Sequence, residues 1–199
     1  MITTYKTIAF KSEGLYKEKG SKFIAYAFPV SSEKEIKEIV ATLKKEFHDA
    51  RHHCFAFRLG ADMNFFRSND DGEPSGTAGK PILGQIQSFG VTNVLIVVVR
   101  YFGGTKLGVG GLIQAYREAA KDALAKAEII EKNVEKQYEL EFSYEQLPEV
   151  MKTLKSVNAG ITKQETGEKY LLFCSVSLIN SPVFEEKLKR LPNFEMKFH

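Results

Sequence analysis

The chain has 199 residues, of which 43% are hydrophobic and 27% charged, a composition typical of a globular protein with one large or two small domains. It has no run of roughly 20 apolar residues, and its N-terminus lacks a basic segment followed by an apolar one, so we expect neither a membrane span nor a secretory signal. Without export, the two cysteines, Cys54 and Cys174, are expected to be reduced thiols in the cytoplasm.

The net charge of +3 is divided unevenly along the chain. Residues 1–130 contain 18 Lys and Arg against 14 Asp and Glu, a net of +4, whereas residues 131–199 contain 10 against 11, a net of −1. The first part is therefore the one that favours an anionic partner. A net charge of +4 is only weak support for nucleic-acid binding, because affinity depends on how the charge is clustered.

The first part of the chain predicts several strands and a helix before a glycine-rich segment. Apolar alternation and turn residues predict strands over residues 5–10, 21–30, 53–59 and 64–67, with a charged turn at residues 17–20. Ser32 followed by Glu35 has the pattern of a capping box, and it predicts a helix whose apolar stripe runs from Ile36 to Phe47.

Two glycine-rich loops follow, and each leads into a predicted helix. The first loop covers residues 70–81 and precedes a helix over residues 82–89. The second loop covers residues 101–111 and precedes a helix that ends near residue 127. Between them, the unbroken apolar run in residues 92–100 predicts a strand that is buried on both faces.

The second part of the chain predicts the element order β-α-β-β-α-β, which is the ferredoxin-like pattern. Its elements are strands over residues 134–142, 161–166, 170–178 and 194–198, and helices over residues 147–157 and 181–191. Gly160 is expected to close the first of these helices. The predicted fold class is therefore α+β with two domains, covering residues 1–130 and 131–199.

Ten of the 15 glycines fall between Gly72 and Gly111. Glycine serves where φ must be positive or where another group must approach the backbone closely. Because both loops lead into helix N-termini, whose free N–H groups attract anions, we expect an anion- or nucleic-acid-binding surface here. Its candidate residues are Lys80, Arg100, Tyr101, Gly103, Gly104, Lys106, Gly108, Gly110 and Gly111. The alternative is that these glycines only make tight turns and close helix–sheet packing.

Two nucleotide-binding motifs are excluded. A P-loop requires Ser or Thr after Gly-Lys, but Pro81 follows Gly79 and Lys80. A Rossmann fingerprint that begins at Gly108 requires a glycine where Ile113 stands.

The first loop begins with acidic residues, and its polar candidates are Asp71, Glu73, Ser75 and Thr77. Together with Asp70, the carboxylates could hold a hard cation or act as an acid–base pair. We favour the alternative, in which Asp71 and Glu73 accept hydrogen bonds from loop amides or pair with Lys80 or Arg100.

Four residues of zinc-ligand type lie close together: His48, His52, His53 and Cys54. In a strand His52 and His53 point to opposite faces, so at most one of them shares a face with Cys54. No second cysteine is nearby. We therefore expect no metal and no cofactor, and we expect Cys54 to be an inert core residue rather than a nucleophile paired with histidine.

The sequence resembles the YigZ/IMPACT family in four segments. The long ones are DGEPSGTAGKP at residues 71–81 and RYFGGTKLGVGGL at residues 100–112, and the short ones are SKFIA at residues 21–25 and HCFAFR at residues 53–58. The resemblance covers the whole chain. It implies a first domain with the ribosomal protein S5 domain-2-like fold and a ferredoxin-like second domain, similar to the last domain of the translocating elongation factor.

The resemblance also implies a place in translation. The same two folds occur in tandem in that elongation factor, so contact with RNA or the ribosome is expected by fold analogy. Eukaryotic relatives regulate translation initiation through an additional N-terminal RWD domain that binds a partner of a stress kinase. This sequence begins at the signature domain, so that mechanism is not carried over, and the family supplies no catalytic residues to carry over.

Three functions remain open. The favoured one is a non-catalytic RNA- or ribosome-binding protein linked to the regulation of translation. In it, Lys80, Arg100 and Lys106 contact phosphates, and Tyr101 stacks on a base. The second is a protein-interaction module that docks through its ferredoxin-like domain. The third is an enzyme acting on a phosphorylated small molecule, with Asp71 or Glu73 as the acid–base group and the loops cradling the phosphate.

Overall fold

The computed structural model describes residues 1–192 and 194–198 and contains two compact units. One unit is Tyr5–Lys132, and the other is Asn133–His199 together with Met1–Thr4. The first residues join the second unit because the Val134 N–H donates to the Thr3 carbonyl over 2.8 Å. The predicted α+β class with two domains is confirmed. Among the described residues, no helix is both long and apolar enough to cross a membrane.

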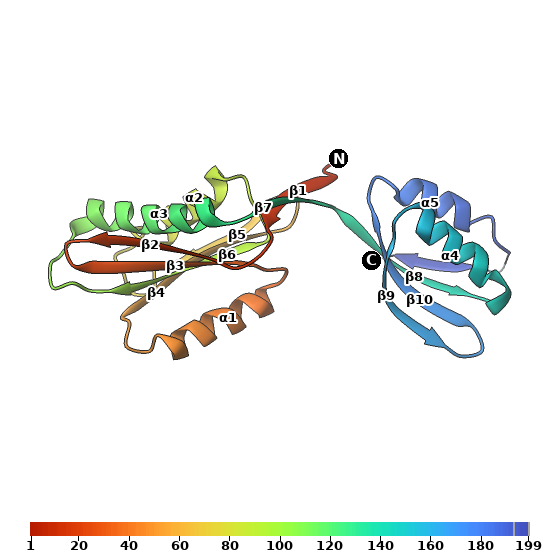
Figure 1. Cartoon of the computed structure of the whole chain (residues 1–199), viewed down its shortest axis with the longest axis horizontal. Coiled ribbons are helices and arrows are strands. Elements are labelled where there is room, and N and C mark those ends of the chain that lie inside the picture. The colour runs from red at the N-terminus through yellow and green to blue at the C-terminus, as the bar shows by residue number, and fades with distance from the viewer. Residues whose placement is uncertain (193, 199) are drawn as a thin grey trace. The chain divides into compact units, whose positions relative to one another are not determined.

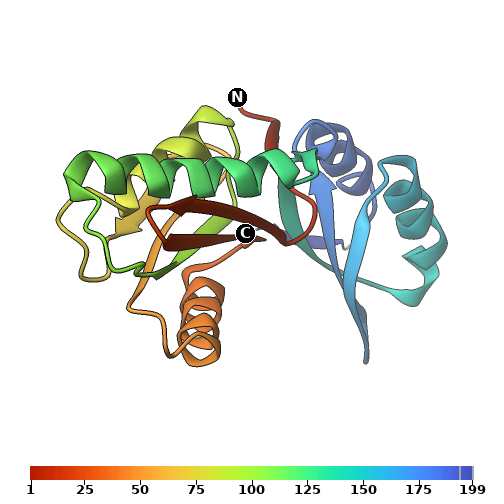
Figure 2. The ribbon, with the colours of Figure 1, turned by 60° about the vertical axis from the view of Figure 1, so that its left-hand side comes forward.

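The first unit is built on a five-stranded antiparallel sheet in the order β2-β3-β6-β4-β5, beside which β1 pairs with β7. Its elements are β1 (Thr4–Ile8), β2 (Ser12–Glu18), β3 (Ser21–Pro29), α1 (Glu33–Glu46), β4 (His52–Leu59), β5 (Phe65–Asn69), α2 (Gly79–Ser88), β6 (Val94–Tyr101), α3 (Gly108–Lys126) and β7 (Ile129–Asn133). Figures 1 and 2 show α1 on one face of the sheet and α2 with α3 on the other. This unit is the S5 domain-2-like domain.

The central strand β6 divides its side chains between two cores, because successive side chains of a strand point to opposite faces. Val98 packs on the side of α2 and α3, and Val99 packs on the side of α1. Both are fully buried, so the prediction of a strand buried on both faces is confirmed. The same alternation sends Arg100 toward α2 and α3, over the Phe23 ring, and Tyr101 toward α1.

The helix α1 begins where the capping pattern predicts. The Ser32 hydroxyl accepts a hydrogen bond from the Glu35 N–H over 3.3 Å, which satisfies one free amide of the first turn. The Glu35 carboxylate accepts from the Ser31 N–H over 2.8 Å, one residue earlier than in a standard capping box.

Two strands of this unit, β2 and β7, were not predicted from the sequence. β2 follows the predicted strand at residues 5–10 and extends into the predicted turn at residues 17–20, in a segment rich in charge. It is held against α3 at Gly14, where an added Cβ would lie 2.3 Å from the Ala123 nitrogen. The glycine thus permits a close approach of strand and helix that no local pattern indicates.

The second unit has the ferredoxin-like order of strands, β11-β8-β10-β9. Its elements are β8 (Glu135–Phe142), a short 3₁₀ turn (Tyr144–Gln146), α4 (Leu147–Ser156), β9 (Gly160–Thr166), β10 (Tyr170–Ser177), α5 (Ser181–Leu188) and β11 (Glu195–Phe198). Leu154 of α4 and Phe184 of α5 are buried in one cluster with Leu140 and Cys174 of the sheet. The predicted βαββαβ fold is confirmed.

The end of α4 differs from the prediction that Gly160 closes it. The helix ends at Ser156, and Asn158 takes the left-handed conformation with a φ of 52°. The N–H groups of Asn158 and Ala159 donate to the carbonyls of Lys155 and Leu154 over 3.2 and 3.0 Å. Asparagine tolerates this conformation, so Gly160 is left to begin β9.

Candidate functional site

The two glycine-rich loops meet around one pocket of about 470 Å³, which we call the loop pocket. The sequence alone could not say whether they would meet. The pocket is lined by Arg51, His52, Glu73, Pro74, Arg100, Phe102, Lys106, Leu107, Gly108, Val109 and Leu112. Its residues come from the start of β4 and the residue before it, the first loop, the end of β6, the second loop and the start of α3.

The first loop is shaped by Asp70, which occupies the N-terminus of α2. The Asp70 carboxylate accepts hydrogen bonds from the N–H groups of Gly76, Ala78 and Gly79, over 2.8, 3.0 and 2.8 Å. Partial burial raises the pKa of this carboxyl, but the three amide donors and nearby Lys80 outweigh that effect and hold its pKa below the usual value. The protein's own carboxylate thus fills the anion position that the sequence analysis left for a ligand.

Glu73 forms a buried network at the base of the loop pocket. Its Oε1 atom accepts from Arg100 Nη1 over 2.5 Å and from the Tyr116 hydroxyl over 2.8 Å. Burial is the main cause that raises the pKa of Tyr116, so its hydroxyl remains a donor at neutral pH. The His52 Nε2 atom lies 4.0 Å from the same carboxylate oxygen. This is the Glu73–Arg100 pairing that we favoured over metal binding.

Arg100 retains hydrogen-bonding capacity within this network. Its guanidinium lies 5.3 Å from the Phe23 ring centroid and 5.7 Å from that of Phe102. Its Nε–H is buried and has no hydrogen-bond partner among the residues that the structure describes. A buried donor without a partner costs free energy, so this nitrogen lowers the stability of the network.

Asp71 points away from the loop pocket, toward α1. Its carboxylate accepts from the His53 N–H and from Lys44 Nζ, each over 2.7 Å. Burial raises the pKa of Asp71, whereas Lys44 and the His53 amide lower it, and the net shift is downward. His53 itself lies near α1, with its Nε2 atom 3.2 Å from the Phe47 carbonyl, and burial is the main cause that lowers its pKa.

Cys54 is a core residue. It is fully buried, and its Sγ atom lies 3.0 Å from the Asp70 carbonyl and 3.3 Å from the Tyr116 hydroxyl. Burial raises the pKa of its thiol far above neutrality, so the reactive thiolate is not formed. Cys174 in the second unit is also fully buried, and burial raises the pKa of its thiol to about 12.

The second loop leaves the N-terminus of α3 open. Its N-cap residue, Leu107, makes no side-chain cap, and the first turn contains no acidic residue. Two exposed cations beside it, Arg51 and Lys106, form no ion pair within residues 1–192 and 194–198. The N-terminus of α2 is filled by a carboxylate, and that of α3 is flanked by cations, so α3 is where an external anion fits.

The second loop requires glycine at different positions for different structural reasons. A Cβ at Gly103 would lie 2.0 Å from the Gly20 carbonyl carbon, so this glycine allows close packing of two loops. Gly104 and Gly108 have positive φ angles of 87° and 71°. Gly110 has no positive φ, and no atom lies within 4 Å of the position of its missing Cβ, so the fold does not explain it.

Several predicted residues lie outside the loop pocket. Tyr101 is on the α1 face of the sheet, where its hydroxyl donates to Asp49 over 2.8 Å, so it does not share a surface with Arg100. Lys80 lines a separate depression together with Arg117 of α3.

The remaining polar candidates of the first loop divide between the turn and the solvent. The Thr77 hydroxyl is buried and donates to the Pro74 carbonyl over 2.7 Å, so it stabilises the turn. Ser75 is exposed. Gly111 packs against Leu107, because an added Cβ would lie 2.9 Å from the Leu107 Cβ.

Three further residues line the pocket that were not predicted from the sequence: Phe102, Arg51 and His52. Phe102 is 50% exposed and follows Arg100 by two positions, so strand alternation was a signal for it. His52 lies in the pocket because β4 pairs with β6 in the register that sets His52 opposite Arg100. No local pattern reveals that register.

Comparison with known proteins finds relatives of this chain. Residues 19–124 match the family model described as the Impact N-terminal domain. The chain belongs to the IMPACT family. It is 36% identical over 172 residues to IMPACT family member YigZ of Escherichia coli (strain K12), covering 85% of this chain and 84% of that protein.

Two further comparisons cover different shares of the chain. Identity to IMPACT family member YvyE of Bacillus subtilis (strain 168) is 37% over 134 residues, covering 67% of this chain and 62% of that protein. A crystal structure titled as that of a hypothetical protein aligns with a TM-score of 0.78 and 31% identity, covering 98% of this chain and 97% of its own. Every residue that lines the loop pocket falls inside the Impact N-terminal domain.

Proposed function

We propose that this IMPACT-family protein is a non-catalytic RNA-binding protein that acts at the ribosome in the regulation of translation, and that the loop pocket is its RNA contact. The observation that carries the proposal is the open N-terminus of α3 beside Arg51 and Lys106. A phosphate there accepts hydrogen bonds from the first N–H groups of the helix and is neutralised by the two side chains.

Electrostatics support a phosphate at this position. The pocket lining contains Arg51, Arg100 and Lys106 against one carboxylate, Glu73. Because Glu73 already forms an ion pair with Arg100, the charges of Arg51 and Lys106 remain available to a ligand.

Phe102 supplies the aromatic surface that the sequence analysis assigned to Tyr101. Its half-exposed ring lies at the pocket edge, with the Arg100 guanidinium 5.7 Å from the ring centroid. Stacking of a base on such a ring contributes about 1–3 kcal/mol and tolerates any sequence. The pocket therefore suits a single-stranded nucleotide, with its phosphate at α3 and its base on Phe102.

The link to translation rests on the family. The S5 domain-2-like and ferredoxin-like folds occur in tandem in the translocating elongation factor, and eukaryotic relatives of this chain regulate translation initiation. This support is an analogy of fold and family, and it favours ribosomal RNA as the RNA that the protein binds.

The enzyme alternative loses its acid–base pair. Asp71 is committed to the His53 amide and Lys44 on the α1 side, and Glu73 is committed to Arg100 and Tyr116. Of these two carboxylates, only Glu73 lines the pocket, and its side chain is 4% exposed. We therefore rank binding above catalysis for this site.

The proposal is tested by co-sedimentation with ribosomes and by titration of a labelled single-stranded RNA of about ten nucleotides, within the usual range of site sizes. The test variant is Arg51→Gln/Lys106→Gln, which removes two exposed charges and leaves the Glu73–Arg100 pair intact. The matched control is Lys80→Gln/Arg117→Gln, which removes the same charge at the separate depression.

We expect wild type and control to bind in a salt-sensitive manner, and the test variant to bind weakly. Its slope of log affinity against log salt should be shallower by about 1.4, because each lost phosphate contact removes about 0.7 for a single strand. Equal losses in both double variants would show that binding follows total charge and not the loop pocket. Absence of binding by the wild type at low salt would reject the proposal.

A further inference from the structure

The strand β5 is an open edge of the five-stranded sheet. The opposite edge, β2, carries charged residues such as Glu13 and Lys17, which discourage pairing with another strand. All of β5 is exposed, including Phe65 at 39% and Phe66 at 46%. An exposed edge strand that carries two phenylalanines is a template for another strand, and soluble proteins normally protect such edges.

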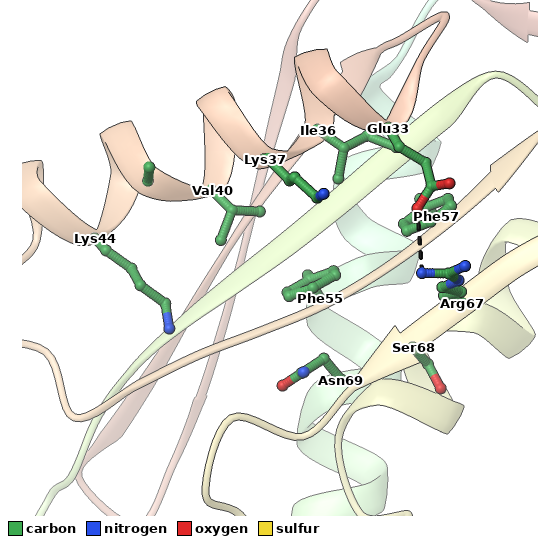
Figure 3. A pocket seen from close by; sticks show the side chains of 11 residues that line it. Glu33, Ile36, Lys37, Val40, Lys44, Phe55, Phe57, Arg67, Ser68 and Asn69 are labelled. Carbon is green, nitrogen blue, oxygen red and sulfur yellow. Dashed lines mark ion pairs between the residues drawn. The ribbon is translucent and has the colours of Figure 1, made fainter.

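A groove of about 410 Å³ lies between this edge and α1 (Figure 3). Phe55 and Phe57 of β4 form its floor, and Ile36 and Val40 form the wall on α1. β5 forms the other wall, because Arg67 pairs in register with Phe57 and so points to the same face. The groove is therefore apolar at its base and continuous with the open edge.

The rim of the groove is basic. Its lining contains Lys37, Lys44 and Arg67 against one carboxylate, Glu33. Lys37 forms no ion pair within the described part of the chain, and Lys44 pairs with Asp71 over 2.7 Å. The Arg67–Glu33 pair spans 3.2 Å, with side chains 63% and 40% exposed, so it is weakly held and can exchange for another carboxylate.

We propose that β5 and this groove bind an extended acidic peptide of a partner protein, which adds a strand to the sheet. Backbone hydrogen bonds to the free edge of β5 supply affinity. Alternate side chains of the added strand point to the α1 face, where a bulky apolar one enters the groove above Phe55 and Phe57. Acidic side chains on either side of it meet Lys37 and Arg67.

The site is independent of the proposed RNA contact. The groove opens on the α1 face of the sheet, and the loop pocket lies on the face that α2 and α3 cover. Of the three functions considered from the sequence, protein interaction thus gains a concrete surface, on the first domain rather than the ferredoxin-like one.

The test begins with random peptides of about ten residues, displayed on phage and selected on the immobilised full-length protein. Enriched peptides are then added to isotope-labelled full-length protein, and the amide resonances are followed by NMR. We expect acidic residues alternating with large apolar ones, and shifts at Phe65–Asn69 and along the groove wall of α1.

Ala41, an exposed groove residue on α1, provides a matched pair of variants. Ala41→Glu and Ala41→Lys place side chains of similar length at one helical position with opposite charge. We expect Ala41→Glu to weaken peptide binding by about tenfold or more and Ala41→Lys to leave it unchanged or strengthen it, because the rim attracts acidic groups.

Four outcomes would overturn the proposal. They are selection that enriches no peptide, peptides whose shifts fall on the loop pocket, equal weakening by both Ala41 variants, and self-association of the free protein through β5. The last would appear as a dimer in sedimentation that Phe66→Lys dissolves, and it would make a second copy the occupant of the edge.

Discussion

Arg100 and Glu73 form a buried ion pair, with 2.5 Å between Arg100 Nη1 and Glu73 Oε1. Their side chains are 8% and 4% exposed, so water cannot solvate either charge well if its partner is removed. The pair joins β6 to the first glycine-rich loop, and the Tyr116 hydroxyl ties the same oxygen to α3. The shape of the loop pocket therefore depends on a contact between residues far apart in the sequence.

Replacing Glu73 by Gln should destabilise the protein by about 3–5 kcal/mol, because it leaves the Arg100 charge buried without a counter-charge. Urea unfolding, followed through a signal of the first domain, measures the loss in the free energy of unfolding. The double variant Glu73→Met/Arg100→Met should recover much of the stability, since replacing a whole buried pair with apolar groups is often neutral. A loss below about 1 kcal/mol in Glu73→Gln would contradict this account of the pair.

Asp70 should make the stability of the protein depend on acid pH. The pKa of its carboxyl in the folded state lies below the ordinary value of about 3.9. The stabilisation is therefore present above the ordinary pKa and is lost as the pH falls through the lowered folded value. Asp70→Asn should cost about 0.5–2 kcal/mol near neutrality, because it removes the negative charge at the helix N-terminus and the oxygen that accepts from the Gly76 N–H.

Urea unfolding of wild type and Asp70→Asn at several pH values between about 7 and 3 measures this dependence. The difference between the two proteins should shrink as the pH falls below the ordinary pKa, because the unfolded wild type then binds a proton at Asp70 more readily than the folded protein does. A difference that stays constant over this range would mean that the amide donors do not hold the Asp70 carboxylate.

Gly110→Ala should separate stability from binding. Gly110 and Gly84 both lie in helices, and neither has an atom within 4 Å of its missing Cβ. Alanine at either position should stabilise the fold by up to about 1 kcal/mol, because glycine weakens helix interiors. Only Gly110→Ala should weaken RNA binding, since its methyl group stands at the open start of α3.

Thermal unfolding and RNA titration of the two glycine variants provide the comparison. Equal RNA affinity of Gly110→Ala and Gly84→Ala would remove the α3 N-terminus from the proposed contact. A loss of stability in Gly84→Ala would show that the space around its missing Cβ is not open.

The two cysteine thiols should be unreactive in the folded protein. Cys54 and Cys174 are fully buried, and burial raises the pKa of both thiols, for Cys174 to about 12. A colorimetric thiol reagent at about pH 8, near the ordinary thiol pKa, should therefore find no fast-reacting group in the native protein and both groups in denaturant. Rapid native labelling of Cys54 would reopen its interpretation as a nucleophile.

Local pattern was sufficient for much of the fold. The apolar run before Arg100 predicted a doubly buried strand, Ser32 with Glu35 predicted the start of α1, and six consecutive elements predicted the ferredoxin-like unit. These features depend on periods of two or 3.6 residues and on caps, which act between neighbours in the chain. Where the stabilising contact is distant, as for β2 against α3 at Gly14, the same reasoning found nothing.

The sequence by itself determined that the two glycine-rich loops precede helices and that cations lie beside them. The tertiary structure decided which groups share the loop pocket. It turned Tyr101 toward α1 and Phe102 toward the pocket, and it filled the N-terminus of α2 with Asp70. The register of His52 opposite Arg100 brought β4 to the site. These arrangements follow from pairing between distant strands and from the burial of charge. Neither can be predicted from the local periodicity of the sequence.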